Sequence, residues 1–144
     1  DDNPTGLPAE TFTPLVEAAT KDRYAFLAGF LQNFYNADHL VPERISDEVI
    51  RNSWNVGVAS SAIGLVQCMV AWGTDFRADL ARLDKPALII HGDADRIVPI
   101  DVTGNPLHAL LPNAKMVTLK GAPHGLLWTH AEDVNAALVE FLGR

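Results

Sequence analysis

The sequence contains little cysteine and few basic residues, and both shortages exclude classes of protein. A single cysteine, Cys68, cannot form an internal disulfide, which excludes a disulfide scaffold. Its apolar neighbours predict a buried, unreactive thiol. Lysine and arginine together number 11 against 18 acidic residues, which gives a formal net charge of −7. Because phosphate binding needs clustered positive charge, we expect no nucleic-acid partner.

Long apolar runs are also missing. The apolar stretch over residues 63–72 is interrupted by Gly64 and Gln67, and it is shorter than the roughly 20 residues that cross a bilayer, so we expect no membrane partner. The chain begins with Asp1, without a methionine and without the basic and apolar regions of a signal peptide. We expect a chain that was processed, trimmed or cut from a longer protein, and a cytoplasmic location.

The 144 residues, 48% of them hydrophobic, fit one soluble globular domain with three stretches of different character. Residues 1–14 are rich in proline and predict an irregular lead-in. Residues 15–73 carry apolar residues at three- and four-residue spacing, which predicts helices. Ser46 is the expected N-cap of one of them. Residues 74–144 predict strands alternating with helices.

Two strands are predicted in the last stretch. Residues 86–92 form a nearly continuous apolar run that ends in glycine, as in a strand buried on both faces. Residues 115–120 alternate and predict a second strand, and a helix over 101–111 would make the two strands parallel. A last helix follows, in which Thr129 and Glu132 have the spacing of a capping box.

Two strands alone do not make a stable sheet. A strand as apolar as residues 88–90 needs helices on both faces and neighbouring strands at its edges, and we find no third strand in the sequence. The pattern therefore predicts an α/β fold that is one part of a larger parallel sheet, completed by a separate segment.

Polar side chains follow both predicted strands. Asp95 lies just past the end of the first strand, and His124 lies just past the end of the second. Because the functional crevice of an open parallel sheet lies outside the carboxyl ends of its strands, we expect these two side chains to meet. A carboxylate that accepts a hydrogen bond from one imidazole nitrogen leaves the other nitrogen free as a general base.

Several alternatives remain beside this acid–base pair. Asp93 is interpreted as a turn or helix-capping residue, and it is a weaker candidate for the acid. His91 and His130 lie near the two loops, but we interpret one as closing the strand and the other as starting a helix, which disfavours a metal site. Arg96 is interpreted as half of a surface ion pair in preference to a substrate anchor.

Five stretches carry a resemblance to a known family. They are Trp-Gly-Thr-Asp-Phe-Arg-Ala-Asp at 72–79, the strand and its His-Gly-Asp-Ala-Asp loop at 86–99, Gly-Ala-Pro-His-Gly-Leu-Leu-Trp-Thr-His at 121–130, and the upstream stretches 22–26 and 51–55. Through them the chain resembles the carboxyl-terminal half of the cofactor-free bacterial haloperoxidases and aryl esterases, which are α/β-hydrolases.

The resemblance implies roles for individual residues. The family's acid falls on Asp95, its base falls on His124, and residues 15–73 correspond to the helical cap over the active site, ahead of the hydrolase core at 74–144. The family's nucleophilic serine occupies a Gly-x-Ser-x-Gly elbow in the amino-terminal half. None of the four serines here has glycine at positions −2 and +2. The resemblance therefore implies a complementing amino-terminal half that carries the nucleophile.

The resemblance further implies a serine esterase and perhydrolase that acts on a small ester, or on a carboxylic acid with peroxide, without haem, metal or another cofactor. An oligomeric assembly is expected. Aromatic residues are candidates for the substrate pocket, although core packing is the alternative for each; they are Phe26, Phe30, Phe34, Trp54, Trp72 and Trp128. The alternative function is a non-catalytic, hydrolase-derived binding or interaction module, because the chain lacks the serine elbow.

Overall fold

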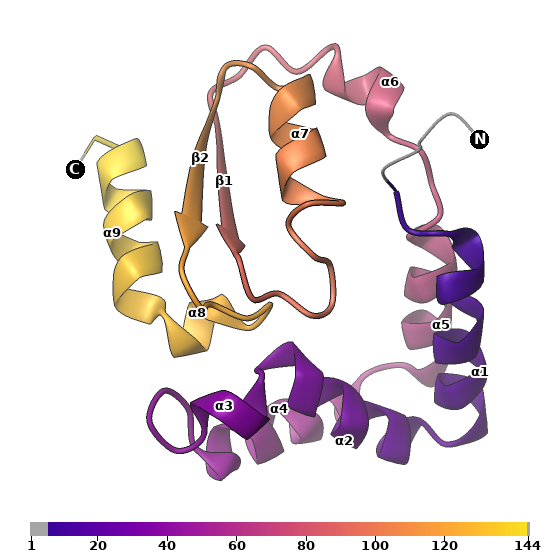
Figure 1. Ribbon diagram of the computed structural model, residues 1–144. Helices are drawn as coiled ribbons and strands as arrows, with labels where there is room; N and C mark the ends of the chain where they lie inside the picture. Colours follow the sequence, from indigo (N-terminus) through magenta and orange to yellow (C-terminus); the bar gives the residue numbers. More distant parts are fainter. Residues whose placement is uncertain (1–5, 144) are drawn as a thin grey trace.

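The computed structural model describes residues 6–143, which form a helical layer and an α/β layer (Figure 1). The helical layer contains a 3₁₀ helix, η1 (Ala9–Thr11), and the helices α1 (Thr13–Lys21), α2 (Arg23–Phe34), α3 (Ala37–Leu40), α4 (Asp47–Ala59) and α5 (Ala62–Ala71). The α/β layer follows with α6 (Arg77–Leu80), β1 (Ala87–Gly92), α7 (Gly104–Leu110), β2 (Ala114–Leu119), α8 (Leu126–Thr129) and α9 (Ala131–Phe141).

Side-chain caps set where the helices of the first layer begin. The Asp22 carboxylate accepts hydrogen bonds from the first backbone N–H groups of α2, and this separates α2 from α1. Ser46 caps α4 through the N–H of Val49, which confirms the predicted N-cap. Ser61 caps α5 in the same way. The predicted helical stretch is therefore several short helices, each started by its own polar side chain.

The two predicted strands pair in parallel, in register from Ala87 opposite Ala114 to Gly92 opposite Leu119. Helix α7 covers one face of this pair and α9 covers the other (Figure 1). Helices therefore lie on both faces of the first strand, as predicted, but residues 87–91 are only half-buried within the described residues. Within the described residues β1 pairs with β2 alone, so its other edge has no neighbouring strand to bury it.

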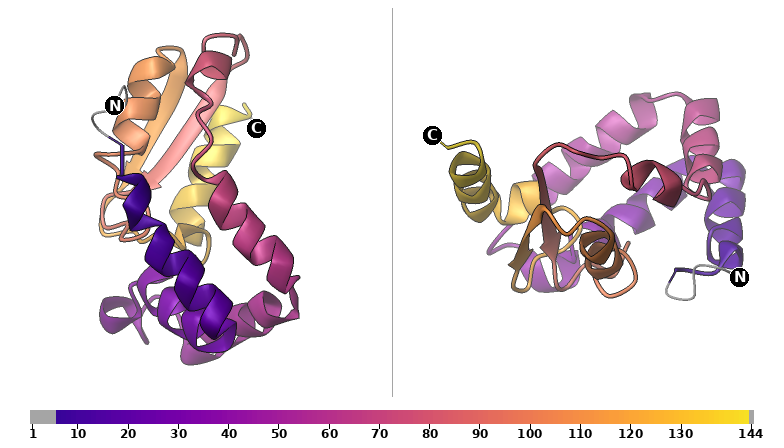
Figure 2. Two further views of the ribbon diagram at one scale, coloured as in Figure 1. Left: turned by 90° about the vertical axis from the view of Figure 1, so that its right-hand side faces the viewer. Right: turned by 90° about the horizontal axis from the view of Figure 1, so that it is seen from above.

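The helical layer and the α/β layer have separate hydrophobic clusters. One lies among α2, α3 and α4, and its buried members are Leu31, Tyr35, Ala37, Ile45 and Ile50. The other lies under α8 and α9 and consists of Ala122, Leu126 and Val134, with Ile90 and Leu119 packed against it. The layers meet where the α2–α3 junction lies beside the loops that follow the strands (Figures 1 and 2).

Two local predictions are wrong. Cys68 is exposed, because α5 packs on α1 through only one face, where Met69 is buried, and the thiol lies on another face. Thr129 is the last residue of α8, and the N-cap of α9 is His130, so Thr129 does not cap α9. The lead-in predicted at 1–14 lies partly outside the described residues, and the boundary at residue 73 stays a prediction.

Helices of membrane-spanning length and apolarity are absent from residues 6–143 when each helix is taken singly. Helices α4 and α5 would reach that length and apolarity if joined, but the chain bends by 96° at the break between them.

Candidate active site

Asp95 and His124 lie at the carboxyl ends of neighbouring strands, and their side chains meet as the sequence predicts. His124 Nδ1 lies 2.8 Å from Asp95 Oδ2. Because a carboxylate only accepts hydrogen bonds, Nδ1 carries the proton, and Nε2 of the neutral ring is left with a free lone pair. The His124 side chain is 35% exposed and that of Asp95 only 3%, so the imidazole is accessible to another group while the carboxylate is covered.

Backbone groups hold the Asp95 carboxylate in place. Its Oδ1 accepts hydrogen bonds from the N–H of Ile97 at 2.8 Å and of Val98 at 2.9 Å, while Oδ2 is left for His124. Burial raises the pKa of Asp95, but the hydrogen bonds from His124 and from the two backbone N–H groups outweigh it, so the pKa lies below its ordinary value. The acid is therefore ionised and fixed in orientation at neutral pH.

The loops that carry Asp95 and His124, which we call the dyad, are connected by hydrogen bonds. Asp93 Oδ1 accepts a 2.6 Å hydrogen bond from the N–H of Gly121, and the N–H of Ala94 donates to the carbonyl of Ala122 at 3.1 Å. Asp93 therefore bridges the two loops, a role that local turn patterns do not reveal. Asp95, and not Asp93, is the carboxylate that faces the histidine.

The other two histidines considered for this region occupy separate positions. His91 Nε2 donates to the carbonyl of Val98 at 2.9 Å and lies 3.4 Å from Asp95 Oδ2. His130 is buried beside Thr129 at the start of α9. Burial, together with the positive charge of Arg44, lowers the pKa of His130. Within residues 6–143, His, Cys, Asp and Glu side chains do not gather in threes as metal ligands would.

Aromatic rings on α2 lead to the dyad. Phe26, Phe30 and Phe34 lie four residues apart on one face of the helix, with ring centroids 5.7 and 5.8 Å apart. Phe34 then meets the imidazole of His124 edge to face at 4.9 Å. Sequence periodicity alone assigns such residues to a core face of a helix. The contact between Phe34 and His124 depends on the tertiary structure, in which the His124 loop lies against α2.

The remaining aromatic candidates lie elsewhere. Trp54 packs against the cluster in the helical layer and donates its Nε1–H to the carbonyl of Tyr24 at 3.0 Å. Trp72 lies edge to face with Phe12, at the far end of that layer. Trp128, on α8, has 57% of its surface exposed. A substrate-pocket role for any of them stays a prediction.

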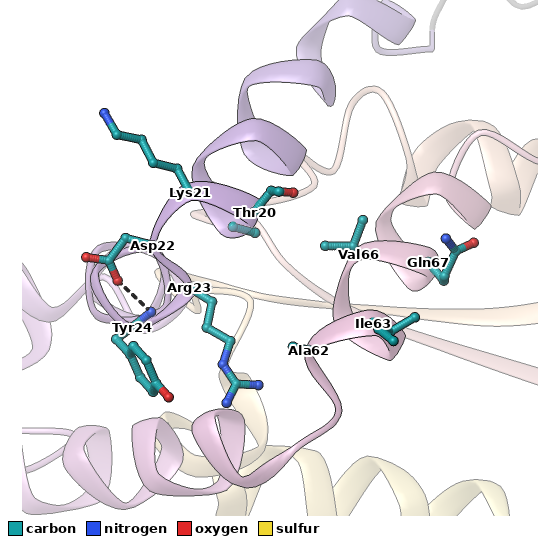
Figure 3. Close-up of a pocket in the computed structure, with 10 residues that line it drawn as sticks. Thr20, Lys21, Asp22, Arg23, Tyr24, Ala62, Ile63, Val66 and Gln67 are labelled. Carbon is teal, nitrogen blue, oxygen red and sulfur yellow. Dashed lines mark hydrogen bonds between the residues drawn. The ribbon is translucent and has the colours of Figure 1, made fainter.

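A hollow of about 780 Å³ lies away from the dyad, between the α1–α2 junction and α5 (Figure 3). Arg23 extends along it and donates to the carbonyls of Val58 and Ser60, at the carboxyl end of α4. Neither Asp95 nor His124 lines this hollow, so the hollow is separate from the candidate active site.

The family is decided by sequence comparison. The sequence model of a family described as alpha/beta hydrolase fold matches residues 3–131. The chain belongs to the alpha/beta hydrolase family. Within that family, a Synechocystis sp. protein provisionally named a non-heme chloroperoxidase is 45% identical over 142 residues, which cover 99% of this chain and 51% of that protein. A bifunctional esterase/perhydrolase of Acinetobacter calcoaceticus is 32% identical over 143 residues, or 99% of this chain and 52% of that one.

Structural comparison agrees with this membership of the alpha/beta hydrolase family. The crystal structure of a bromoperoxidase from Bacillus anthracis superposes with a TM-score of 0.92 and 37% identity, covering 100% of this chain and 52% of that one. The chain spans about half the length of the curated relatives it matches. The two-stranded structure is therefore part of an alpha/beta hydrolase fold, as the sequence predicts.

Proposed function

We propose that this chain supplies the acid and the base of a Ser-His-Asp triad in an esterase whose nucleophilic serine lies on another segment. The observation that carries the proposal is the 2.8 Å hydrogen bond between His124 Nδ1 and Asp95 Oδ2, made at the ends of adjacent parallel strands. That geometry leaves Nε2 of His124 free to accept a proton from a hydroxyl.

The reaction proceeds by acyl transfer. The serine oxygen attacks the ester carbonyl while His124 Nε2 takes its proton, and His124 then returns that proton to the leaving alcohol. Water adds to the acyl-enzyme with the same base, which releases the acid and restores the serine. Asp95 stabilises the imidazolium that forms in each step, and its lowered pKa keeps it charged for this purpose.

Peroxide takes the place of water in a second use of the same site. Hydrogen peroxide attacks the acyl-enzyme, the serine leaves, and a peracid is released that can oxidise a halide in solution. A relative named a bifunctional esterase/perhydrolase and others named non-heme chloroperoxidases support this extension. The protein's substrates would be small esters, or a carboxylic acid with peroxide.

A complementing segment with a Gly-x-Ser-x-Gly elbow would provide both the nucleophile and the missing strands. Two features support it: the edge of β1 that has no neighbouring strand within the described residues, and a set of large apolar side chains, 49% to 76% exposed, on α4, α5 and the segment between α5 and α6. That set consists of Val56, Ile63, Val70, Trp72 and Phe76. Covering such surface is favourable, because apolar area removed from water stabilises an assembly.

The test compares two histidine variants of the assembled enzyme with a chromogenic ester. Loss of the general base in His124→Ala is expected to lower kcat by about 10⁶-fold. The control, His108→Gln, changes a histidine that contacts the carbonyl of Ala114 at the opposite ends of the strands, and it should keep full activity. Full activity in His124→Ala would remove the proposed role and favour a non-catalytic binding module.

A further inference from the structure

Residues 34–38, from the end of α2 to the start of α3, contact both loops that carry Asp95 and His124. The carbonyl of Phe34 accepts a 2.8 Å hydrogen bond from the N–H of Gly125, the residue after His124. Two residues on, Asn36 Nδ2 donates at 2.8 Å to the carbonyl of Ala94, the residue before the acid. One short segment of the helical layer therefore holds the neighbour of the base and the neighbour of the acid.

A further link lies on the other side of the acid. Asp38 and Arg96 form a two-pronged ion pair, with distances of 2.8 and 3.2 Å, which confirms the predicted surface pair. Both side chains are partly exposed, so water and salt weaken this contact. The Asn36 side chain is buried, so its hydrogen bond to Ala94 is weakened by solvent less than the ion pair is.

Asn36 has two features that are unfavourable for the stability of the folded chain. Its backbone is left-handed, with φ at 48°, a conformation that is uncommon outside glycine and that asparagine tolerates better than most residues. Its side-chain Oδ1 is buried, and within the described residues it has no hydrogen-bond partner. Strained and unsatisfied residues of this kind concentrate at functional sites, where the surrounding structure holds them in place.

We propose that Asn36 is a positioning residue for the acid–base pair, which ties the Asp95 loop to the helical layer so that the carboxylate stays aligned with His124. The inference rests on the proposed function, since alignment matters only if the pair performs proton transfer. It also makes the helical layer part of the catalytic geometry, because movement of the α2–α3 junction would shift both loops together.

The test replaces Asn36 by glycine and by alanine in the assembled enzyme. Both variants remove the donor to Ala94, but glycine adopts the left-handed backbone without strain whereas alanine does not. We expect kcat to fall about tenfold in both variants, with KM little changed, since small misplacements of reacting groups slow chemistry more than binding. The melting temperature should fall further in Asn36→Ala than in Asn36→Gly.

A proton NMR measurement provides a readout that does not depend on catalysis. The His124 Nδ1 proton, bonded to Asp95, should give a far-downfield signal in the parent enzyme and in the control Asn113→Gly, an exposed turn residue at the opposite end of β2. In both Asn36 variants that signal should broaden or disappear.

The outcomes separate the positioning role from a structural one. Three results would each overturn the proposal. They are a loss of kcat that is proportional to the loss of melting temperature across the variants, an intact NMR signal with unchanged kcat, and failure of Asn36→Gly to fold. A parent enzyme without esterase activity would contradict the proposed function instead, and the NMR signal would still decide whether Asn36 aligns the pair.

Discussion

The contact between Gly125 and the helical layer predicts a sharp effect of one added methyl group. Gly125 has φ at −75° and ψ at 33°, so its φ lies outside the left-handed region that favours glycine. An added Cβ would, however, overlap two carbons of the Tyr35 ring and lie 3.0 Å from Phe34 Cδ1. This overlap of the added Cβ with the Tyr35 and Phe34 rings is the main expected effect of the substitution.

The structure decides which partner must move. Tyr35 is 3% exposed, and its hydroxyl is hydrogen-bonded to Ser53 at 2.8 Å, so the ring is held from behind. Carbon atoms prefer separations of about 3.5–4.0 Å, so the loop must retreat by more than about 1 Å. That retreat breaks the Gly125–Phe34 hydrogen bond and displaces His124. Overpacking of this kind costs about 1–3 kcal/mol, and a misplacement of about 1 Å lowers kcat about 10²-fold.

The assay measures kcat and KM for ester hydrolysis together with the free energy of unfolding. Gly29→Ala is the matched control, because this position lies within α2, where an added Cβ meets no atom within 4 Å. A helix-interior glycine replaced by alanine should stabilise by about 0.5–1 kcal/mol without changing kcat. If Gly125→Ala kept kcat within twofold of the parent, the account of how the loop docks would be refuted.

Two further predictions concern the acid and a buried histidine. Asp95→Asn should keep an oxygen for the two backbone N–H groups but present an NH₂ to His124, which enforces the wrong tautomer, so kcat measured with the ester should fall by about 10⁴-fold; a loss under tenfold would contradict the role. The lowered pKa of His130 means that the unfolded chain binds a proton more readily than the folded one, so stability should fall as pH drops below about 6.5 and through the lowered folded-state pKa. The urea midpoint of unfolding, measured across pH 5–7.5, should fall with pH in the parent and fall less in His130→Asn. An equal dependence of the urea midpoint on pH in the two proteins would contradict this prediction.

Much of the fold and the meeting of the dyad could be predicted because both follow from local patterns. Apolar runs fix the two strands, the β-α-β order fixes their parallel direction, and strand ends place Asp95 and His124 at one edge. A capping serine is likewise a local signal, as Ser46 shows. The incomplete sheet was also visible, because apolar strands without neighbours signal a missing part.

What could not be predicted depends on contacts between distant segments. The exposure of Cys68 depends on which face of α5 meets α1, and composition does not carry that information. The edge contact of Phe34 with His124 and the bond from Asn36 to Ala94 join residues 90 and 58 positions apart. The left-handed backbone of Asn36 has a weak sequence preference and no visible partner until the layers are placed together.

The central claim is that His124 activates a serine located on another segment, outside these 144 residues, and chemical labelling tests this claim most directly. The assembled enzyme would be treated with a fluorophosphonate, which reacts with activated serines, and the labelled peptide identified by mass spectrometry. We predict phosphonylation of one serine in a Gly-x-Ser-x-Gly elbow outside these 144 residues, at a rate that collapses in His124→Ala. Labelling at an equal rate in that variant, or no labelled serine in the active parent, would contradict the account.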